Sequence, residues 1–473
     1  MAHPGLHKVE FETSGNHFLM EQISVFLQSY SIQMNRFENH RHIVRLAAPI
    51  ILANASAPLL GLADTATIGQ TGHAADLGAI ALATLVFSFV YWGFSFLRMG
   101  TTGFMAQAAG ASNKKEVITV AYRSVLLGLA IGVTLILLQF FIGKLALWLM
   151  SASDEVKALV MDYFYIRIWG APATLMTYAI LGSLIGLSWT KELLWVQLLL
   201  NGTNIALNIL FVLGAGLGIK GIALGTLIAE WIAFFYAGHL LIRNLNIRDL
   251  WQQFRDHWQQ IINKAKLLAV FKVNTDIMLR TLALLSGFAW FADQGAKLGD
   301  TTLAANHVLL QFVSLSAFFL DGFAHVSEML SGKAIGANDK DGFIKQFRHS
   351  TQLAGITAVV LALGIIVFSP FTIGLLTKDT DVQKVAMEHA VYAGIYILLS
   401  FVAFQLDGVF IGATKSKEMR NSTLISFIIL VGVGTVMMQY YGNAGLWISF
   451  VVYVVARGIF LGLYVPKIMR ESF

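Results

Sequence analysis

The sequence predicts an all-α integral membrane protein with twelve transmembrane helices in two pseudo-symmetric lobes of six. Of its 473 residues, 56% are hydrophobic and only 13% are charged, which is about half of the ~25% usual in soluble domains. Apolar runs of ~20 residues, the length that a spanning helix needs, recur along the whole chain. The second half of the chain also repeats motifs of the first half, which indicates two copies of one six-helix unit.

The repeat holds at one offset in separated places. Gly110-Ala-Ser-Asn-Lys-Lys returns as Gly336-Ala-Asn-Asp-Lys-Asp, 226 positions later (336 minus 110). Other pairs at this offset are Gly186 with Gly412 and Met161-Asp162 with Met387-Glu388. Because each copy holds six spans, both copies have the same orientation in the membrane. Parallel repeats of this kind are typical of secondary transporters, with the substrate path between the halves.

The elements follow in order along the chain. A polar N-terminal tail over 1–41 has no signal-peptide pattern. The N-lobe then covers 42–243, a cytoplasmic linker covers 244–266, and the C-lobe with a short cytoplasmic tail covers 267–473. The twelve expected spans are 42–69, 77–108, 117–149, 157–187, 193–214, 219–243, 267–292, 302–333, 344–374, 382–413, 419–439 and 444–466.

The linker carries an amphipathic pattern. Trp251, Phe254, Trp258 and Ile261 recur at three- and four-residue spacing, with polar residues between them. This spacing predicts a helix that lies on the cytoplasmic membrane surface. We expect it to join the two lobes and assign it no chemistry.

Basic residues predict the orientation of the chain. Each loop that follows an even-numbered span is rich in Lys and Arg, as at Lys114, Lys115 and Lys340. The alternate loops are poor in them, and 70–76 and 441–445 contain none. An excess of Lys and Arg marks the cytoplasmic side. We therefore expect an inner (cytoplasmic) membrane protein with both termini in the cytoplasm, and the positive net charge does not indicate a nucleic-acid partner.

The first span carries a carboxylate. Asp64 lies inside the apolar run 45–69, where a charge is costly to bury, so it is a candidate functional residue. Pro49 and Pro58 lie in the same span, and proline removes a backbone donor and favours a bend. A bent helix with one protonatable group is suited to move when an ion binds. The alternative is a structural Asp near a helix end.

Other classes of chemistry are disfavoured. The chain has no cysteine, which excludes a disulfide, a thiolate metal site and a Cys nucleophile. No phosphate-binding loop of the Gly-x-x-x-x-Gly-Lys-Ser/Thr type occurs, so an ion gradient is the expected energy source rather than ATP. We expect no enzyme activity, no metal site and no cofactor other than the coupling ion.

Polar side chains on the fifth and sixth spans complete the first candidate site. Asn204 and Asn208 are four residues apart, as are Thr226 and Glu230, so each pair shares one helix face. Together with Asp64 they could direct oxygen atoms to one point, which suits Na⁺ or a proton relay. The alternative is ordinary hydrogen bonding between membrane helices.

A second candidate set lies on later spans. Asp321, His325 and Glu328 form one stripe on the eighth span, and we expect them to line the substrate path or to close a hydrogen-bond network. The spacing is weak support for a metal site, because no complete ligand set is present. On the seventh span, Asp276 and Arg280 are four residues apart and are expected to form an intrahelical ion pair.

Longer motifs resemble those of a known family. They are Pro58-Leu-Leu-Gly-Leu-Ala-Asp64-Thr-Ala, Phe96-Leu-Arg-Met-Gly-Thr-Thr-Gly103, Leu303-Ala-Ala-Asn-His-Val-Leu-Leu-Gln and Leu320-Asp-Gly-Phe-Ala-His-Val-Ser-Glu328. From about Met34 to its end, the chain resembles the multidrug and toxic compound extrusion (MATE) family and, more narrowly, the DNA-damage-inducible protein F branch. The resemblance implies a twelve-helix, two-lobe exporter of organic cations and other amphipathic toxic compounds, driven by Na⁺ or H⁺.

The resemblance also implies roles for the first candidate site. In that family the Asp of the first helix carries the coupling ion, and Asp64 matches it. Asn204 and Thr226 match two partner residues, but the second carboxylate of the family pattern is replaced by Asn208. Fewer ligand charges weaken a site for a hard cation. H⁺ is therefore favoured, and Na⁺ is the alternative if Glu230 supplies the missing charge.

The sequence thus predicts a monomeric secondary exporter whose partners are small amphipathic drugs or toxicants and the lipid bilayer. A flippase for a lipid-linked substrate, from the wider superfamily, is less favoured because it would need a strongly cationic central cavity. A membrane-embedded enzyme is also less favoured, because it would need a convergent catalytic set.

Overall fold

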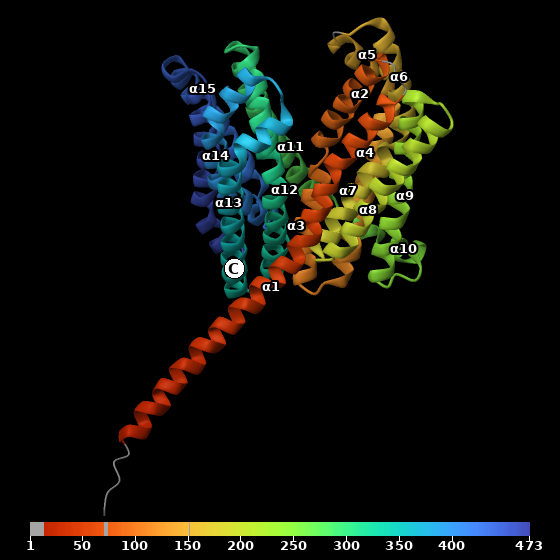
Figure 1. Cartoon of the computed structure of the whole chain (residues 1–473). Coiled ribbons are helices and arrows are strands. Elements are labelled where there is room, and N and C mark those ends of the chain that lie inside the picture. The colour runs from red at the N-terminus through yellow and green to blue at the C-terminus, as the bar shows by residue number, and fades with distance from the viewer. Residues whose placement is uncertain (1–13, 71–73, 151) are drawn as a thin grey trace, which may run out of the picture.

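The computed structural model of the protein describes residues 14–70, 74–150 and 152–473. These residues form helices joined by short turns, with no strand in any of the three ranges, which confirms the predicted all-α class. Figure 1 shows two bundles of helices side by side. The bundles converge toward the end that bears the C-terminus and diverge toward the opposite end, and we call these the converging end and the diverging end.

The first bundle holds the helices from the first half of the chain. They are α1 (Ser14–Gly69), α2 (Ala74–Gly93), α3 (Phe96–Gly110), α4 (Lys114–Leu137), α5 (Gln139–Leu149), α6 (Asp154–Arg167), α7 (Ala171–Gly186), α8 (Thr190–Ile209) and α9 (Gly218–Asn244). Three predicted spans are each divided into two helical segments, α2 and α3, α4 and α5, and α6 and α7. A five-residue π-helical turn, Leu210–Gly214, extends α8.

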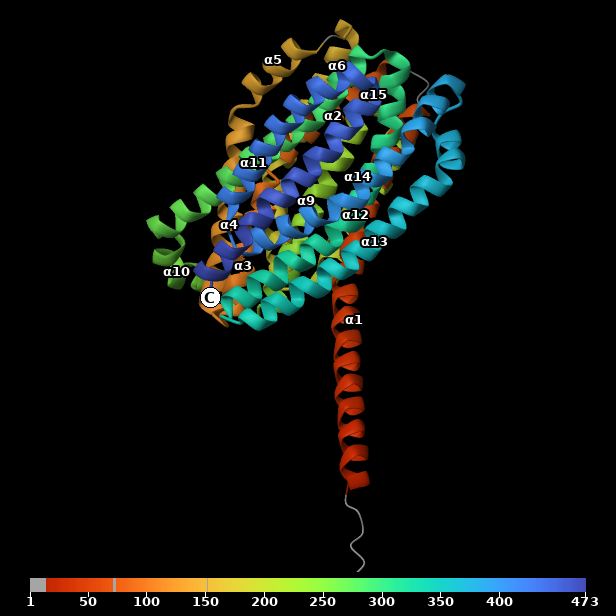
Figure 2. The ribbon, with the colours of Figure 1, turned by 90° about the vertical axis from the view of Figure 1, so that its left-hand side faces the viewer.

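Helix α1 is longer than the span predicted for it. It continues through Pro49 and Pro58 and also reaches back to Ser14, into the predicted N-terminal tail. Figures 1 and 2 show this first part projecting away from the bundles beyond the converging end. Residues 1–13 of the predicted tail lie outside the described residues.

The second bundle holds five helices from the second half of the chain. They are α11 (Lys264–Lys297), α12 (Asp300–Gly336), α13 (Lys340–Leu376), α14 (Thr380–Gly412) and α15 (Ser416–Glu471). Among the described residues, 10 helical stretches are long and apolar enough to cross a membrane. Two further spans complete the set. Helix α15, counted once among the ten, contains two spans, and α11, which carries the charged residues Asp276 and Arg280 in its middle, is the other. The total of twelve agrees with the predicted number.

The last two spans fold back on each other within α15. The chain turns at Gly442, where φ is 54°, a backbone conformation that favours glycine. Beyond the turn, the two arms are antiparallel. Lys467 pairs with Glu418 (Nζ to Oε1, 2.8 Å) and Lys415 pairs with Glu471 (Nζ to Oε2, 2.6 Å) at the converging end.

The two bundles repeat each other in backbone detail, as the sequence repeat predicts. Ser188 and Thr414, the residues 226 positions apart that follow α7 and α14, have positive φ values of 64° and 55°. The side chain of Asn113 caps α4 by accepting from the backbone of Glu116, and Asp339 caps α13 in the same way. Equivalent turns and caps at one offset confirm that each half is a copy of the same six-helix unit.

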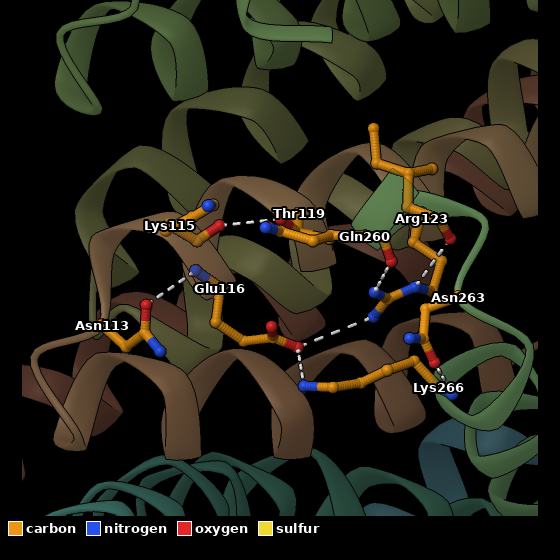
Figure 3. Close-up of polar contacts among 9 residues, drawn as sticks. Asn113, Lys115, Glu116, Thr119, Arg123, Gln260, Asn263 and Lys266 are labelled. Atoms are coloured by element: carbon orange, nitrogen blue, oxygen red, sulfur yellow. Dashed lines mark hydrogen bonds and ion pairs between the residues drawn. The ribbon is translucent and has the colours of Figure 1, made fainter. Parts of the chain in front are cut away.

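The linker forms helix α10 (Leu250–Ile261), which is docked on α4 (Figure 3). Arg123 of α4 donates to the carbonyl oxygens of Gln260 (2.9 Å) and Ile261 (3.3 Å) at the end of α10. A cation at a helix C-terminus complements the helix dipole. Lys266, just beyond, pairs with Glu116 of α4 at 2.7 Å. The linker is thereby fixed to the first bundle, while the domain boundaries given above stay predictions.

Close packing between α12 and α14 requires glycine at one position. A Cβ at Gly408 would collide with the backbone carbonyl of Ala324. We predict that Gly408→Ala lowers the free energy of unfolding by about 1–3 kcal/mol, the usual cost of overpacking. The melting temperature of the detergent-solubilised protein is the measurement. The matched control is Gly432→Ala, because an added Cβ there meets nothing within 4 Å; equal melting of the two variants would contradict this packing.

Candidate functional site

A chain of hydrogen bonds links α1, α8 and α9. The side-chain amide of Asn208 donates to Asp64 Oδ1 (2.7 Å) and to Asn204 Oδ1 (2.7 Å). Asn204 in turn donates to Thr226 Oγ1 (2.9 Å), and the Thr226 hydroxyl donates to the carbonyl of Ile222 (2.8 Å). The structure therefore brings together four of the five residues predicted for the first site.

Neighbouring residues fix the orientation of these hydrogen-bonded side chains. Asn204 and Asn208 are one turn apart on α8 and buried, whereas Asp64 is half-buried. Gly225 of α9 leaves room for Asn208, because a Cβ at Gly225 would collide with Asn208 Oδ1. That oxygen has no hydrogen-bond partner among the described residues. Asn208 thus presents its amide nitrogen, and not its oxygen, to the Asp64 carboxylate.

Glu230, the fifth residue of the predicted site, belongs to a different cluster. Its Oε1 pairs with Nη2 of Arg167 on α6 at 3.2 Å. Arg167 also donates to the Tyr163 hydroxyl (3.1 Å) and lies over the Phe87 ring, 4.6 Å from its centre. It interacts electrostatically with Asp64 as well. In the described part of the chain, Arg167 forms an ion pair with Glu230 and not with Asp64.

A cavity of about 280 Å³ lies between the two bundles. Polar side chains from four helices reach it, and these are Asn54, Arg98, Gln197, Asp321 and His325. Aromatic rings of Tyr91, Trp92, Tyr178 and Phe318 form further parts of the wall. Two of the three residues predicted for the substrate path, Asp321 and His325, therefore line a cavity that both bundles build.

The third predicted residue, Glu328, is buried behind His325. Glu328 Oε2 lies 3.1 Å from Nδ1 of His325, and Nη1 of Arg98 lies 3.2 Å from its Nε2. Because arginine only donates, His325 accepts from Arg98 through a ring nitrogen. Arg98 belongs to α3 and His325 to α12, so this contact joins the bundles. In the described residues, the Asp321 carboxylate accepts no hydrogen bond, which leaves its oxygens to the cavity.

The predicted intrahelical pair between Asp276 and Arg280 is wrong. Asp276 pairs with Arg420 of α15 at 2.5 Å, and Arg280 pairs with Asp407 of α14. Asp407 also accepts from Arg457 of α15 at 2.7 Å. The i, i+4 spacing places two side chains on one helix face, but in the packed bundle each of them meets a neighbouring helix with an opposite charge of its own.

Sequence reasoning did not identify all the cavity residues. Asn54 and Gln197 carry no distinguishing pattern in the sequence, and they are placed at the cavity only by the packing of α1 and α8. Arg98 lies within the Phe96–Gly103 motif, which was the one available signal for it. Gln107 and Lys333, which occupy equivalent positions of the repeat and contact the opposite bundle, were also missed.

Comparison with known proteins agrees with this architecture. The MatE family model matches residues 49–210 and 290–436. DNA damage-inducible protein F of Escherichia coli is 34% identical over 418 residues, which cover 88% of this chain and 90% of that protein. The multidrug resistance protein NorM of Vibrio vulnificus is 24% identical over 453 residues, 93% of this chain and 98% of that protein. The structure of a mutant of the Vibrio cholerae MATE transporter VcmN matches with a TM-score of 0.84 at 18% identity and covers 93% of this chain and 98% of that one.

The Arg167–Glu230 pair yields a test of stability. Arg167→Met should lower the free energy of unfolding by about 3–5 kcal/mol, because it leaves the Glu230 carboxylate buried without its partner. Thermal unfolding in detergent is the measurement. The double variant Arg167→Met, Glu230→Gln should regain most of the loss. Lys220→Met, which removes the exposed pair with Asp162 (3.2 Å), is the matched control and should cost about 1 kcal/mol or less. A double variant as unstable as Arg167→Met would contradict the pairing.

Proposed function

Because the chain belongs to the MatE family, it is a membrane transporter and not an enzyme, and we propose that it exports amphipathic organic cations and other toxic compounds from the cell in exchange for protons. Its relatives include multidrug resistance proteins, which supports small drug-like molecules as substrates. The observation that carries the proposal is the half-buried Asp64 carboxylate, which accepts a hydrogen bond from Asn208. Asp64 lies on α1, and α1 also lines the cavity through Asn54.

The surroundings of Asp64 favour H⁺ over Na⁺. A Na⁺ site needs several oxygen atoms that converge on the ion, and hard-cation affinity rises with the number of charged ligands. Asn208 presents a nitrogen to Asp64, and the Glu230 carboxylate is held by Arg167. A proton needs only Asp64 itself. The Na⁺ alternative requires Glu230 to leave Arg167 and turn toward α1.

Pro58 can link protonation of Asp64 to a movement of α1. We infer that a proton from outside the cell neutralises Asp64 and weakens its charge-assisted bond with Asn208. Pro58 has no backbone N–H, so the carbonyl of Asn54, one turn earlier, lacks its helical donor and α1 can change its bend there. Asn54 lines the cavity, so the change reaches the substrate. One net charge moved through 100 mV supplies ~2.3 kcal/mol, which sustains a gradient of roughly fifty-fold for a neutral substrate. Exchange of one proton for one monovalent cation moves no net charge, so the pH difference drives that export.

The lining of the cavity supports an amphipathic cation as the substrate. The Asp321 oxygens are available to the cavity and can balance a positive charge. Tyr91, Trp92 and Tyr178 also line the cavity. Aromatic rings attract a cation through their faces and pack against an apolar body. We propose that Asp321 is the counter-ion of the substrate. We also propose that His325 and Glu328 position the Arg98 side chain at the cavity wall.

The distribution of basic loops supports one orientation in the membrane. The Lys- and Arg-rich turns after α3 and α12, the α10 linker and the C-terminus all lie at the converging end (Figure 1). We propose that this end faces the cytoplasm and that the protein is an inner-membrane protein with both termini on that side. One chain builds the whole cavity, which supports a monomer as the functional unit.

Coupling is tested by uptake of a fluorescent organic cation into everted vesicles, with an H⁺ gradient and a Na⁺ gradient imposed separately. We predict uptake on the H⁺ gradient alone, and a loss of at least about 100-fold in Asp64→Asn, because the amide cannot bind the proton that drives the change.

Controls separate coupling from folding. Asp64→Glu keeps a protonatable group and should retain part of the uptake. Asp154→Asn, at an exposed position in the first turn of α6, should match the wild type. Full uptake by Asp64→Asn would overturn the scheme, and uptake on Na⁺ alone would show that the coupling ion is Na⁺.

Substrate charge tests the role of Asp321. Asp321→Asn should reduce uptake of a monovalent cation about tenfold and leave uptake of a neutral substrate of similar shape nearly unchanged, since only the cation loses its counter-charge. The ratio of the two initial rates is the measurement. Asp300→Asn, an exposed carboxylate in the first turn of the same helix, is the matched control. Equal loss for both substrates would show that Asp321 supports the structure and not cation selection.

A further inference from the structure

Two sets of hydrogen bonds join the bundles at the converging end, outside the sites described so far. In the first set, Gln107 of α3 donates through Nε2 to the carbonyl oxygen of Gly412 (2.8 Å) and to Oγ1 of Thr414 (3.3 Å). Gly412 is the last residue of α14 and Thr414 follows it, so both acceptors lie in the opposite bundle. This set therefore ties the first bundle to the second.

The second set runs in the opposite direction. Lys333 of α12 donates through Nζ to the carbonyl oxygen of Leu187 (3.0 Å) and to Oγ of Ser188 (2.9 Å). These acceptors follow the C-terminal end of α7, in the first bundle. Lys333 is partly buried and forms no ion pair among the described residues, so the helix end is its counter-charge.

The two sets have equivalent donors and equivalent hydroxyl acceptors. Gln107 and Lys333 are 226 positions apart, and so are Ser188 and Thr414. The backbones also approach reciprocally. A Cβ at Gly110 would collide with the carbonyl of Lys333, and a Cβ at Gly336 would collide with the carbonyl of Gln107. The end of α3 and the end of α12 therefore lie directly against each other, each with its side chain bonded to the far helix end.

We propose that Gln107 and Lys333, with their four acceptors, form a two-part latch that holds the cytoplasmic end of the cavity shut and must open before a substrate can enter from the cytoplasm. The inference rests on the proposed function in two respects, because it takes the cavity as the substrate path and the converging end as the cytoplasmic end. Gln107 and Lys333 are positioning residues, because they set which side of the cavity is open and do not touch it.

The chemistry of the latch suits repeated opening. Every acceptor is a carbonyl or hydroxyl at a helix end, so water can replace the lost hydrogen bonds when the bundles part, and the net strength of each bond is modest. The two parts differ in strength. Lys333 places a full positive charge at the negative end of a helix dipole, whereas Gln107 is neutral. Lys333 should therefore dominate.

The absence of native cysteine allows a direct test in the full-length protein. Ser95, which lines the cavity, is replaced in Ser95→Cys as a single reactive thiol. Everted vesicles and right-side-out vesicles are then treated with a membrane-impermeant maleimide. The rate of labelling from each side measures how often the cavity opens to that side, and no transport is needed for this readout.

Each latch variant has a stated result. On the Ser95→Cys background, Lys333→Ala should raise labelling from the cytoplasmic side by roughly tenfold and Gln107→Ala by roughly threefold, in keeping with one charged and one neutral hydrogen-bond donor. Lys333→Gln, which copies the residue of the other half, should give an intermediate rate. Gln107→Lys should slow cytoplasmic labelling. Lys340→Gln, an exposed lysine at the same end, is the matched control and should have no effect.

The possible outcomes decide between the latch and a merely structural role. Unchanged cytoplasmic labelling in Lys333→Ala and Gln107→Ala, with normal labelling from the other side, would overturn the latch. Should Lys333→Ala fail to fold, Lys333→Gln and Gln107→Lys decide the question, because the latch predicts opposite shifts for them. If the variants show these shifts while the wild-type protein exports nothing, the proposed function is contradicted and the latch stays in place.

Discussion

A polar group inside a membrane has to find its partner within the protein, because lipid tails offer none. The described helices follow this constraint closely. Glu230 is held by Arg167, Asp276 by Arg420, and Asp407 by both Arg280 and Arg457. Each pair joins two different helices, so the charges also fix how the helices are rotated against each other. Carboxylates without an ion-pair partner are therefore candidates for a functional role. Asp64 is held only by an amide, and Asp321 faces the cavity.

The two halves share a backbone but differ in chemistry. The turns, caps and close glycine contacts of the first half return in the second at one offset. The polar interiors do not follow this symmetry. In the first bundle a chain of neutral amide and hydroxyl groups leads from Asp64 to Thr226. In the second bundle, Asp407 lies between two arginines. This asymmetry supports placing the proton in the first bundle.

Helix α3 connects these features. Near its start, Arg98 reaches the cavity and His325 of the other bundle, and near its end Gln107 bonds the end of α14. Its glycine positions let it approach α12 and α14 backbone to backbone, as at Gly103, where a Cβ would collide with the carbonyl of Ile411. A movement of one bundle against the other therefore has to break contacts of α3 at both depths. The cavity wall and the proposed latch are in this way parts of one interface.

The sequence by itself determined the features that depend on one helix at a time. Hydropathy gave the spans, because each span must be apolar over its own length. The repeat offset gave two equivalent halves, and four-residue spacing put Asn204 and Asn208 on one face of α8. The sequence did not determine which charged side chains pair with each other. Glu230 shares a face with Thr226 yet pairs with Arg167, and Asp276 and Arg280 share a face yet pair with other helices. Only the tertiary structure decided these partners, because helical periodicity fixes directions within one helix, whereas contact depends on how neighbouring helices are placed and rotated.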